Sequence, residues 1–301
     1  SAVVTVTLSI GVSRMVKRNA IVRRLSSVET LGSTTVICSD KTGTITKNEM
    51  TVRYIFLPST NATVSGTGYS KEGQYYYAPS PESCVDFHAT GEPFDISKSN
   101  EMNMLLKTGQ LCSSASLARN PDDESSWRVV GDPTEGALLV AAEKAGITAE
   151  KLDSMYEEVT EFSFDSKRKR MTSIYRDNEG QVWAFTKGAP EVILERATRV
   201  LLNNEEKTLD HSRRNEILQA NTALAACAMR VIALAYRKLD DISGNWDESE
   251  VENDLVFLGL VGMIDSPREG VMEAIAKSRK AGVRPIMITG DHALTAVSIA
   301  R

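Results

Sequence analysis

Two short apolar runs, far apart in the chain, each lead to a small polar turn that contains a carboxylate. The first run, at 36–38, leads to Asp40, and the second, at 284–288, leads to the sequence Thr-Gly-Asp at 289–291. Short apolar runs bounded by turn residues are typical of buried strands. Open α/β sheets bind ligands at the carboxyl ends of their strands. We therefore predict that the turn at 289–291 lies beside Asp40.

The last part of the chain has the pattern of a strand, a helix and a second strand. An apolar run at 255–264 is followed by an amphipathic segment at 268–281, which stops at Gly282, and then by the run at 284–288. Glycine often ends a helix, and continuous apolar runs are typical of strands that are buried on both faces. We therefore predict a parallel strand, helix and strand unit in which both strands are buried.

The region between these two parts has a mixed pattern. Its predicted elements are a strand at 51–57, loops or short hairpins at 58–81, a helix at 99–115, a strand at 127–130, a helix that Asp132 caps and Pro133 begins, a strand at 182–186, a helix from Pro190 to about Ala197, a strand at 231–236 and an acidic, exposed connection at 237–253. The sequence therefore predicts an α+β domain inserted into an α/β domain.

The composition narrows the class of protein only slightly. A chain of 301 residues, 42% hydrophobic and 25% charged, is globular and long enough for two domains. The net charge of -5 and the lack of a dominant basic stripe argue against a nucleic-acid-binding protein. The cysteines form no Cys-x-x-Cys pair, and there are only 3 histidines, which argues against a zinc site.

The first residues of the chain are apolar and are followed by a basic segment. The apolar part, at 1–10, is too short to cross a bilayer, which needs ~20 residues, and Arg14, Lys17 and Arg18 come soon after it. An apolar segment with a basic flank is typical of the cytoplasmic end of a membrane helix. The alternative is an amphipathic helix that is buried in the protein.

Asp40 has the surroundings of a nucleophile that attacks a phosphoryl group. Lys41 supplies a positive charge, Thr42 and Thr44 supply hydroxyl donors, and Gly43 allows backbone amides to approach phosphate oxygens. A strand followed by a polar turn explains Asp-Lys alone equally well. However, the whole string at 36–46 resembles the phosphorylation motif of the P-type cation-transporting ATPases, and differs from its usual form only by isoleucine in place of leucine at 45.

The resemblance implies a haloacid-dehalogenase-like, Rossmann-like phosphorylation domain. Asp40 would attack the γ-phosphate of ATP, and Asp40 and the carbonyl group of Thr42 would bind Mg²⁺. Thr289 and Gly290 would hold the transferred group, while Asp291 and Lys41 would tune the charge around it. Soluble phosphatases of this superfamily usually have a second aspartate where this chain has Thr42. A threonine cannot serve as their general acid and base, so we expect a persistent phosphoenzyme.

A second group of residues has the composition of an adenine-nucleotide pocket. The segment at 164–171 places one aromatic residue beside four cations, which suits a purine and its phosphates, although a solvated strand end looks the same. In the turn that follows the strand at 182–186, Gly188 would allow close approach of the backbone. The residues that match nucleotide-pocket positions of calcium-pump-like P-type ATPases are Glu135, Phe164, Lys169, Lys187 and Arg230.

Two further segments differ in informative ways from known patterns. The sequence Asp265-Ser-Pro-Arg268 is similar to the Asp-Pro-Pro-Arg of the family, so the resemblance implies that Asp265 and Arg268 contribute to the nucleotide site. Ser266 removes one rigid proline and predicts a looser hinge. Ser166 replaces an arginine of some animal calcium pumps, which leaves one phosphate contact in doubt. The chain has no Walker sequence and no Gly-x-Gly-x-x-Gly turn. This excludes a nucleotide bound on a P-loop or on the glycine-rich turn of a Rossmann fold.

The resemblance implies ATP-driven transport of a cation across a membrane, with calcium favoured, an aspartyl-phosphate intermediate, and ATP and Mg²⁺ as cofactors. The alternatives are a haloacid-dehalogenase-type phosphatase and a non-catalytic ATP-binding fragment. The expected parts are the end of a membrane helix and its stalk at 1–25, the phosphorylation domain at 26–49 and 256–301, and the nucleotide-binding domain at 50–255. We expect this region to be cytoplasmic and truncated at both ends, to lack the membrane helices and the cation site, and to be inactive by itself. We expect no nucleic acid partner.

Overall fold

The structure is a computed structural model that describes residues 2–24, 26–81, 91–121, 123–240, 246–268 and 270–289. The chain divides into two compact units, of which the first contains Ser1–Ile45 and Pro267–Gly290 and the second contains Thr46–Ser266. We expected divisions at 49 and 255, but the strands that lead into and out of the second unit, β2 and β13, extend across these positions. The nucleotide-pocket candidates at 135–230 therefore all belong to the second unit.

The first unit has few elements, which come from both ends of the sequence. They are α1 (Ala2–Val16), α2 (Ser26–Gly32), β1 (Val36–Asp40), the tight turn η1 (Lys41–Ile45), α9 (Val271–Lys280) and β14 (Arg284–Ile288). Strands β1 and β14 are parallel neighbours, which agrees with the prediction that the chain after β14 passes beside Asp40. The prediction that β14 is buried is wrong, because Ile286 and Ile288 are 38% and 56% exposed. The physical reason is that β1 and β14 form only a two-stranded sheet in the described part of the chain. Helix α9 buries none of its residues, so it does not cover this sheet.

The N-terminal helix α1 exposes its apolar side chains. Val3, Val4, Val6 and Ile10 are all more than half exposed, so α1 is not the buried amphipathic helix of the alternative interpretation. In the described residues, no helix is both long enough and apolar enough to cross a membrane.

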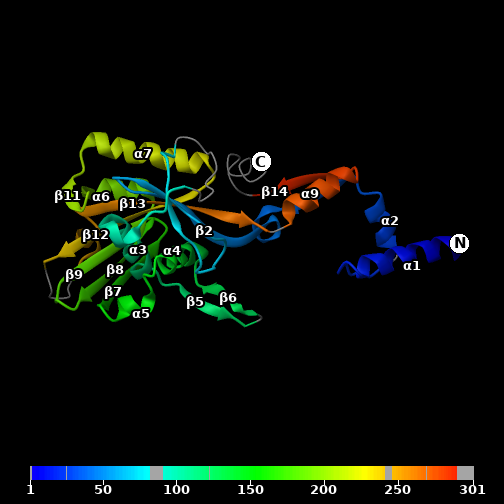
Figure 1. Cartoon of the computed structure of the whole chain (residues 1–301), viewed down its shortest axis with the longest axis horizontal. Helices are drawn as coiled ribbons and strands as arrows, with labels where there is room; N and C mark the ends of the chain where they lie inside the picture. Colours follow the sequence, from blue (N-terminus) through cyan, green and yellow to red (C-terminus); the bar gives the residue numbers. More distant parts are fainter. Residues whose placement is uncertain are drawn as a thin grey trace. The chain divides into compact units, whose positions relative to one another are not determined.

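The second unit is built on one large sheet with helices on both of its faces (Figure 1). The strands of the sheet follow the order β4-β3-β2-β13-β12-β9-β8-β7, with β10 beside β13 and β11 beside β10. The hairpin β5–β6 forms a separate small sheet. The elements of this unit are β2 (Thr46–Phe56), β3 (Asn61–Val64), β4 (Tyr75–Tyr77), η2 (Ile96–Lys98), α3 (Asn100–Leu111), β5 (Ser116–Asn120), β6 (Asp123–Val130), α4 (Pro133–Lys144), α5 (Ala149–Asp153), β7 (Tyr156–Asp165), β8 (Arg170–Asp177), β9 (Val182–Gly188), α6 (Pro190–Arg196), β10 (Ala197–Leu202), β11 (Glu205–Thr208), α7 (His211–Ala226), β12 (Arg230–Leu239), α8 (Glu248–Val251) and β13 (Leu255–Pro267).

The hydrophobic core of this unit has two main layers, one on each face of the sheet. Helices α3, α4 and α5 pack on one face, and helices α6 and α7 pack on the other. Strand β13 contributes to both layers, since Val256 and Leu258 point into the first and Leu255 and Phe257 into the second. This position explains the continuous apolar run of β13, because a strand that is covered on both faces has no solvent-facing side.

The position of β13 overturns the predicted parallel strand, helix and strand unit. In the large sheet, β13 is antiparallel to β12 and parallel to β10, whereas β14 pairs with β1 in the first unit. The apolar pattern identified both strands but could not identify their partners, because a run buried on both faces fits the centre of a mixed sheet as well as a parallel one.

The prediction of an exposed connection at 237–253 is also wrong in part. Strand β12 continues to Leu239, and the short helix α8 follows later in the segment. Val251 is 3% exposed and Glu252 is fully buried. The acidic composition suggested a solvated loop, but the carboxylate of Glu252 has arginine partners in the interior of the unit.

Candidate functional site

Asp40 lies at the carboxyl end of β1, in the first unit. The parallel pairing of β1 with β14 places Asp40 opposite Ile288, so that Thr289 follows at the same end of the two strands. Asp40 is exposed, and Lys41 beside it is only 6% exposed. Gly290 and Asp291 lie outside the described residues. The end of this strand pair therefore presents a carboxylate and a threonine next to each other.

The turn η1, which follows Asp40, is held by an arginine from the other end of the sequence. Gly43 has a φ of 73°, a conformation that glycine adopts without strain. Nη2 of Arg268 donates to the carbonyl oxygen of Gly43 at 2.9 Å, and the backbone N–H of Arg268 donates to the carbonyl oxygen of Ile45 at 2.9 Å. Arg268, which we expected near the nucleotide, is thus a clamp on the turn that contains Thr42.

Asp265 also connects segments that are distant in the sequence, within the second unit. Its side chain is buried, and its two carboxylate oxygens accept hydrogen bonds from Oγ1 of Thr46 at 2.5 Å and from the backbone N–H of Glu49 at 3.2 Å. These bonds tie the beginning of β2 to the end of β13, which are neighbours in the sheet. Asp265 therefore fixes the two strands that lead into and out of this unit.

The five nucleotide-pocket candidates lie at one end of the large sheet. Strands β7, β8, β9 and β12 are successive antiparallel neighbours, with Asp165 opposite Arg170, Arg170 opposite Gly188 and Gly188 opposite Ala233. The end of β7, the start of β8, the end of β9 and the start of β12 are therefore adjacent. The candidates at this end are Phe164 near the end of β7, Lys169 on the β7–β8 turn, Lys187 on β9, Arg230 at the start of β12 and Glu135, which contacts Lys187.

Glu135 and Lys187 form a direct ion pair. Nζ of Lys187 lies 2.6 Å from Oε1 of Glu135 and also donates to the carbonyl oxygen of Cys112, and the Lys187 side chain is only 8% exposed. The other carboxylate oxygen of Glu135 accepts hydrogen bonds from the backbone N–H groups of Ser114 at 3.0 Å and Ala115 at 2.9 Å. The ammonium group of Lys187 is thereby held beside the segment that leads from α3 to β5.

Arg230 contacts the N-terminus of α4, next to the ion pair of Glu135 with Lys187. Asp132 caps the helix, as we predicted, by accepting the backbone N–H groups of Thr134 at 2.7 Å and Glu135 at 3.3 Å. Nη1 of Arg230 donates to Oγ1 of Thr134 at 2.8 Å. Partial burial raises the pKa of the Asp132 carboxyl group, but the bonds from Thr134 and Glu135 and the charge of Arg230 outweigh it and lower this pKa overall.

We expect Asp132→Ala to lower the free energy of unfolding by about 1 kcal/mol, because the helix loses its N-cap. Asp132→Asn is the matched control, since asparagine caps helices as well as aspartate does and only the charge is lost. Because folding lowers the pKa of Asp132, the contribution of its charge is present at neutral pH and is lost as the pH falls through that lowered pKa. Urea unfolding of both variants at neutral and acidic pH measures the two effects. If both variants lost the same free energy of unfolding, the capping hydrogen bonds would contribute nothing to stability.

Phe164 is a large aromatic side chain at the surface. It is 62% exposed, which excludes the interpretation that it belongs to the core. Lys169, on the turn that follows β7, has a 59% exposed side chain, and its Nζ lies 4.0 Å from Oε1 of Glu191. An exposed ring beside a lysine can stack on a base and contact the attached phosphates.

Gly188 is required by its neighbours in the sheet. A Cβ atom at this position would lie 2.7 Å from the carbonyl oxygen of Lys169 and 2.7 Å from Cβ of Arg170. The backbone N–H of the next residue, Ala189, donates to the same carbonyl oxygen at 3.0 Å. We expected Gly188 to allow a ligand to approach the backbone, but the close approach in this structure is that of the β7–β8 turn.

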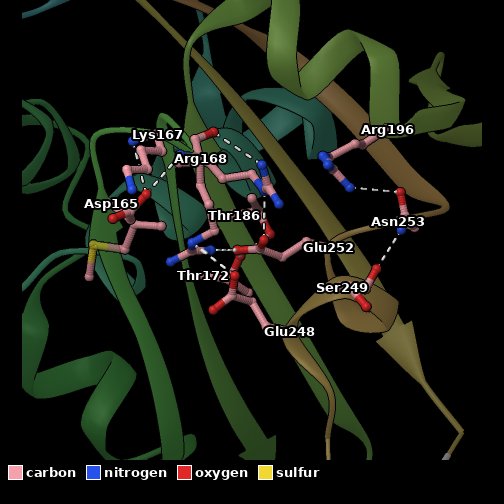
Figure 2. A network of polar contacts seen from close by, with 12 residues as sticks. Asp165, Lys167, Arg168, Thr172, Thr186, Arg196, Glu248, Ser249, Glu252 and Asn253 are labelled. Carbon is pink, nitrogen blue, oxygen red and sulfur yellow. Dashed lines mark hydrogen bonds and ion pairs between the residues drawn. The ribbon is translucent and has the colours of Figure 1, made fainter.

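The structure adds residues that the sequence did not single out. Two of the four cations after Phe164 are paired with the buried carboxylate of Glu252, namely Arg168 (Figure 2) and Arg170. The basic run therefore does not supply four charges to a ligand. The sequence contained no local signal of this arrangement. Glu252 is 84 positions from Arg168 and 82 positions from Arg170, so nothing near the arginines in the sequence identified it as their partner.

Comparisons with known proteins agree with the resemblance of the phosphorylation motif. Residues 101–270 match the family model of the P-type ATPase cytoplasmic domain N. The chain is 39% identical over 301 residues to a calcium-transporting ATPase of Bacillus subtilis, covering 100% of this chain and 32% of the relative. It is 40% identical over 305 residues to the cation-transporting ATPase pma1 of Synechocystis, with coverages of 100% and 32%. For calcium-transporting ATPase 1 of Bacillus cereus the identity is 37% over 300 residues, with coverages of 100% and 30%.

This chain thus spans about a third of the length of the curated relatives that it matches. The family model, in contrast, matches more than half of the chain itself, from the beginning of α3 to the residue directly before α9. The chain belongs to the P-type ATPases.

Proposed function

We propose that this chain is the phosphorylation and nucleotide-binding part of an ATP-driven cation transporter. The observation that carries the proposal is the convergence of Glu135, Phe164, Lys169, Lys187 and Arg230 at one end of the large sheet. These residues come from separate elements, and together they offer an exposed aromatic face and several cations. A site of this kind suits a purine with attached phosphates.

In this proposal Phe164 stacks on the adenine ring. Lys187 is oriented by Glu135, and Arg230 by Thr134, so both cations are held by protein contacts before a nucleotide arrives. Lys169 lies on the turn beside Phe164 and contacts the phosphates. Such preorganised cations bind phosphates without first losing the freedom of a flexible side chain.

Asp40 is the proposed nucleophile. Its carboxylate attacks the γ-phosphate of ATP and forms an aspartyl phosphate, and ADP leaves with the electron pair of the broken bond. The Asp40 carboxylate and the carbonyl oxygen of Thr42 are the kind of oxygen ligands that Mg²⁺ takes, and bound Mg²⁺ would offset negative charge between the carboxylate and the phosphate. The clamp of Arg268 on Gly43 and Ile45 keeps the turn with Thr42 in one conformation.

Thr42 favours a transporter over a phosphatase. A phosphatase of this type needs a second carboxylate to activate the water that removes the phosphate, and the hydroxyl group of threonine cannot act as that base. The aspartyl phosphate should therefore persist long enough for conformational steps to follow. Calcium is the proposed ion, because relatives of this chain are named calcium-transporting ATPases.

The test uses membrane vesicles that contain the whole protein. We expect ATP-dependent uptake of radiolabelled calcium, together with an acid-stable phosphoenzyme whose amount rises with the calcium concentration. Sodium, potassium and proton transport are measured in the same vesicles. ATP hydrolysis without any acid-stable phosphoenzyme would refute the mechanism, and transport of one of the other cations alone would refute the assignment of calcium.

A further inference from the structure

Glu252 is a fully buried carboxylate with three hydrogen-bond donors around it. It accepts hydrogen bonds from Nη1 of Arg168 at 2.6 Å and Oγ1 of Thr172 at 2.9 Å (Figure 2), and from Nε of Arg170 at 2.6 Å. Oγ1 of Thr172 is also 3.0 Å from Oγ1 of Thr186 on the next strand. A buried charge is tolerated only when it is paired and hydrogen-bonded, so these contacts are tightly coupled.

The two arginine donors of Glu252 flank the exposed lysine of the candidate site. Arg168 and Arg170 lie on either side of Lys169, whose φ of 53° is unusual for a residue with a side chain. Such a backbone conformation is strained and persists only where the surroundings enforce it. Nη2 of Arg168 also donates to the carbonyl oxygen of Ser163 at 2.6 Å, so the same guanidinium group reaches the residue before Phe164.

Glu252 is itself fixed by contacts that do not involve this turn. Its backbone N–H donates to the carbonyl oxygen of Glu248 at 3.1 Å, at the end of helix α8. Nη1 of Arg237 donates to the carbonyl oxygens of Glu250 at 2.6 Å and Asn253 at 2.8 Å. Residues 248–253 are therefore anchored to the sheet, and Glu252 presents its carboxylate to the β7–β8 turn.

We propose that Glu252 is a positioning residue for nucleotide binding. It holds Arg168 and Arg170 and thereby keeps Lys169 and Phe164 in the geometry that receives the phosphates and the base. This inference rests on the proposed ATP binding at this end of the sheet. It also assigns Arg168 and Arg170 to the support of the turn, whereas Lys169 is the lysine directed to the ligand.

Two measurements on the 301-residue chain test this role, and only one of them depends on a nucleotide. The first is the dissociation constant of ATP, from calorimetric titration. The second is the rate of trypsin cleavage after Lys167 and Lys169, identified by mass spectrometry of the fragments. A turn that has lost its support is cleaved faster, whether or not ATP binds there.

For Glu252→Gln we expect ATP to bind about tenfold more weakly, because the turn must be ordered when the nucleotide binds. We also expect cleavage at the turn to be several-fold faster. The matched control is Glu101→Gln, which changes another buried carboxylate of the same unit. Glu101 accepts hydrogen bonds from Ser59 and from the backbone of Asn203, on two other turns. This control should lose stability but keep the wild-type affinity for ATP and the wild-type cleavage rate at 167–169.

If Glu252→Gln fails to fold, Arg168→Gln provides a second, milder test. This variant leaves the ion pair between Arg170 and Glu252 in place. It should show smaller changes in the same direction in both measurements. The double variant Arg170→Gln/Glu252→Gln removes a cation together with its carboxylate partner and should recover part of the stability that Glu252→Gln loses.

The outcomes separate this inference from the proposed function. Unchanged ATP affinity in Glu252→Gln and Arg168→Gln, with stability losses like that of Glu101→Gln, would overturn the positioning role. Faster cleavage with unchanged ATP affinity would also overturn it, because the turn would then be ordered by Glu252 without serving the nucleotide. Failure of the wild-type chain to bind ATP would refute the nucleotide site itself, and the cleavage rates would still report whether Glu252 orders the turn.

Discussion

Replacing Asp40 by asparagine should reduce phosphoenzyme formation in the whole protein to background and leave ATP binding unchanged. The amide group has nearly the same shape as the carboxylate but is a poor nucleophile, so the reaction loses its attacking atom. Asp40 is exposed at the end of β1, and the nucleotide-pocket candidates belong to the other unit. Folding and ATP affinity should therefore be insensitive to the substitution.

The matched control for this prediction is Glu29→Gln, which removes an exposed carboxylate from helix α2 of the same unit. Its phosphoenzyme level should equal that of the wild type. Both variants are measured by acid quench after brief exposure to γ-labelled ATP, with calorimetric ATP binding in parallel. Label retained on the asparagine variant at the wild-type level would show that Asp40 is not the nucleophile.

Replacing Phe164 by alanine should weaken ATP binding by roughly 1 to 3 kcal/mol, the range found for bases that stack on aromatic side chains. Because Phe164 is 62% exposed, its removal should create no cavity and should leave the melting temperature almost unchanged. In the whole protein, phosphorylation by inorganic phosphate should survive, since no adenine takes part in that reaction.

Met155→Ala is the control for Phe164→Ala, because Met155 is another large exposed apolar side chain of the same unit, 42% exposed. It should change neither ATP affinity nor melting temperature. A Phe164→Ala variant with a clearly lowered melting temperature and normal ATP affinity would identify Phe164 as a packing residue.

Local chemistry explains why parts of the fold could be predicted from the sequence. The Asp132-Pro133 pair specifies a cap and a first helical turn, and helix α4 begins there. Helix α6 begins at Pro190 for a similar reason. The turn after β14 was predicted to lie beside Asp40 because two apolar runs lead to similar polar turns, and the parallel pairing of β1 and β14 agrees with this. In the two helices, a few adjacent residues determine where the element begins.

The errors concern relations between distant segments. The apolar run of β13 indicates a strand covered on both faces, but nothing local shows that β12 and β10 are its neighbours. The buried position of Glu252 depends on Arg168 and Arg170, so its acidic surroundings in the sequence were misleading. The sequence selected both Glu135 and Lys187 as candidates, but it did not show that they form an ion pair. That contact depends on how α4 and β9 are placed in the folded unit.

The central claim is that an aspartate at the end of β1 accepts a phosphoryl group from ATP, and identification of the phosphorylated residue tests it most directly. The whole protein is mixed briefly with γ-labelled ATP and calcium, quenched in acid and digested, and the labelled peptide is sequenced by mass spectrometry. We predict that the label is on the peptide containing Asp40, that it is stable in acid, and that hydroxylamine releases it, as expected of an acyl phosphate. Label on a serine or threonine, resistant to hydroxylamine, or no label on any peptide, would contradict the proposed mechanism.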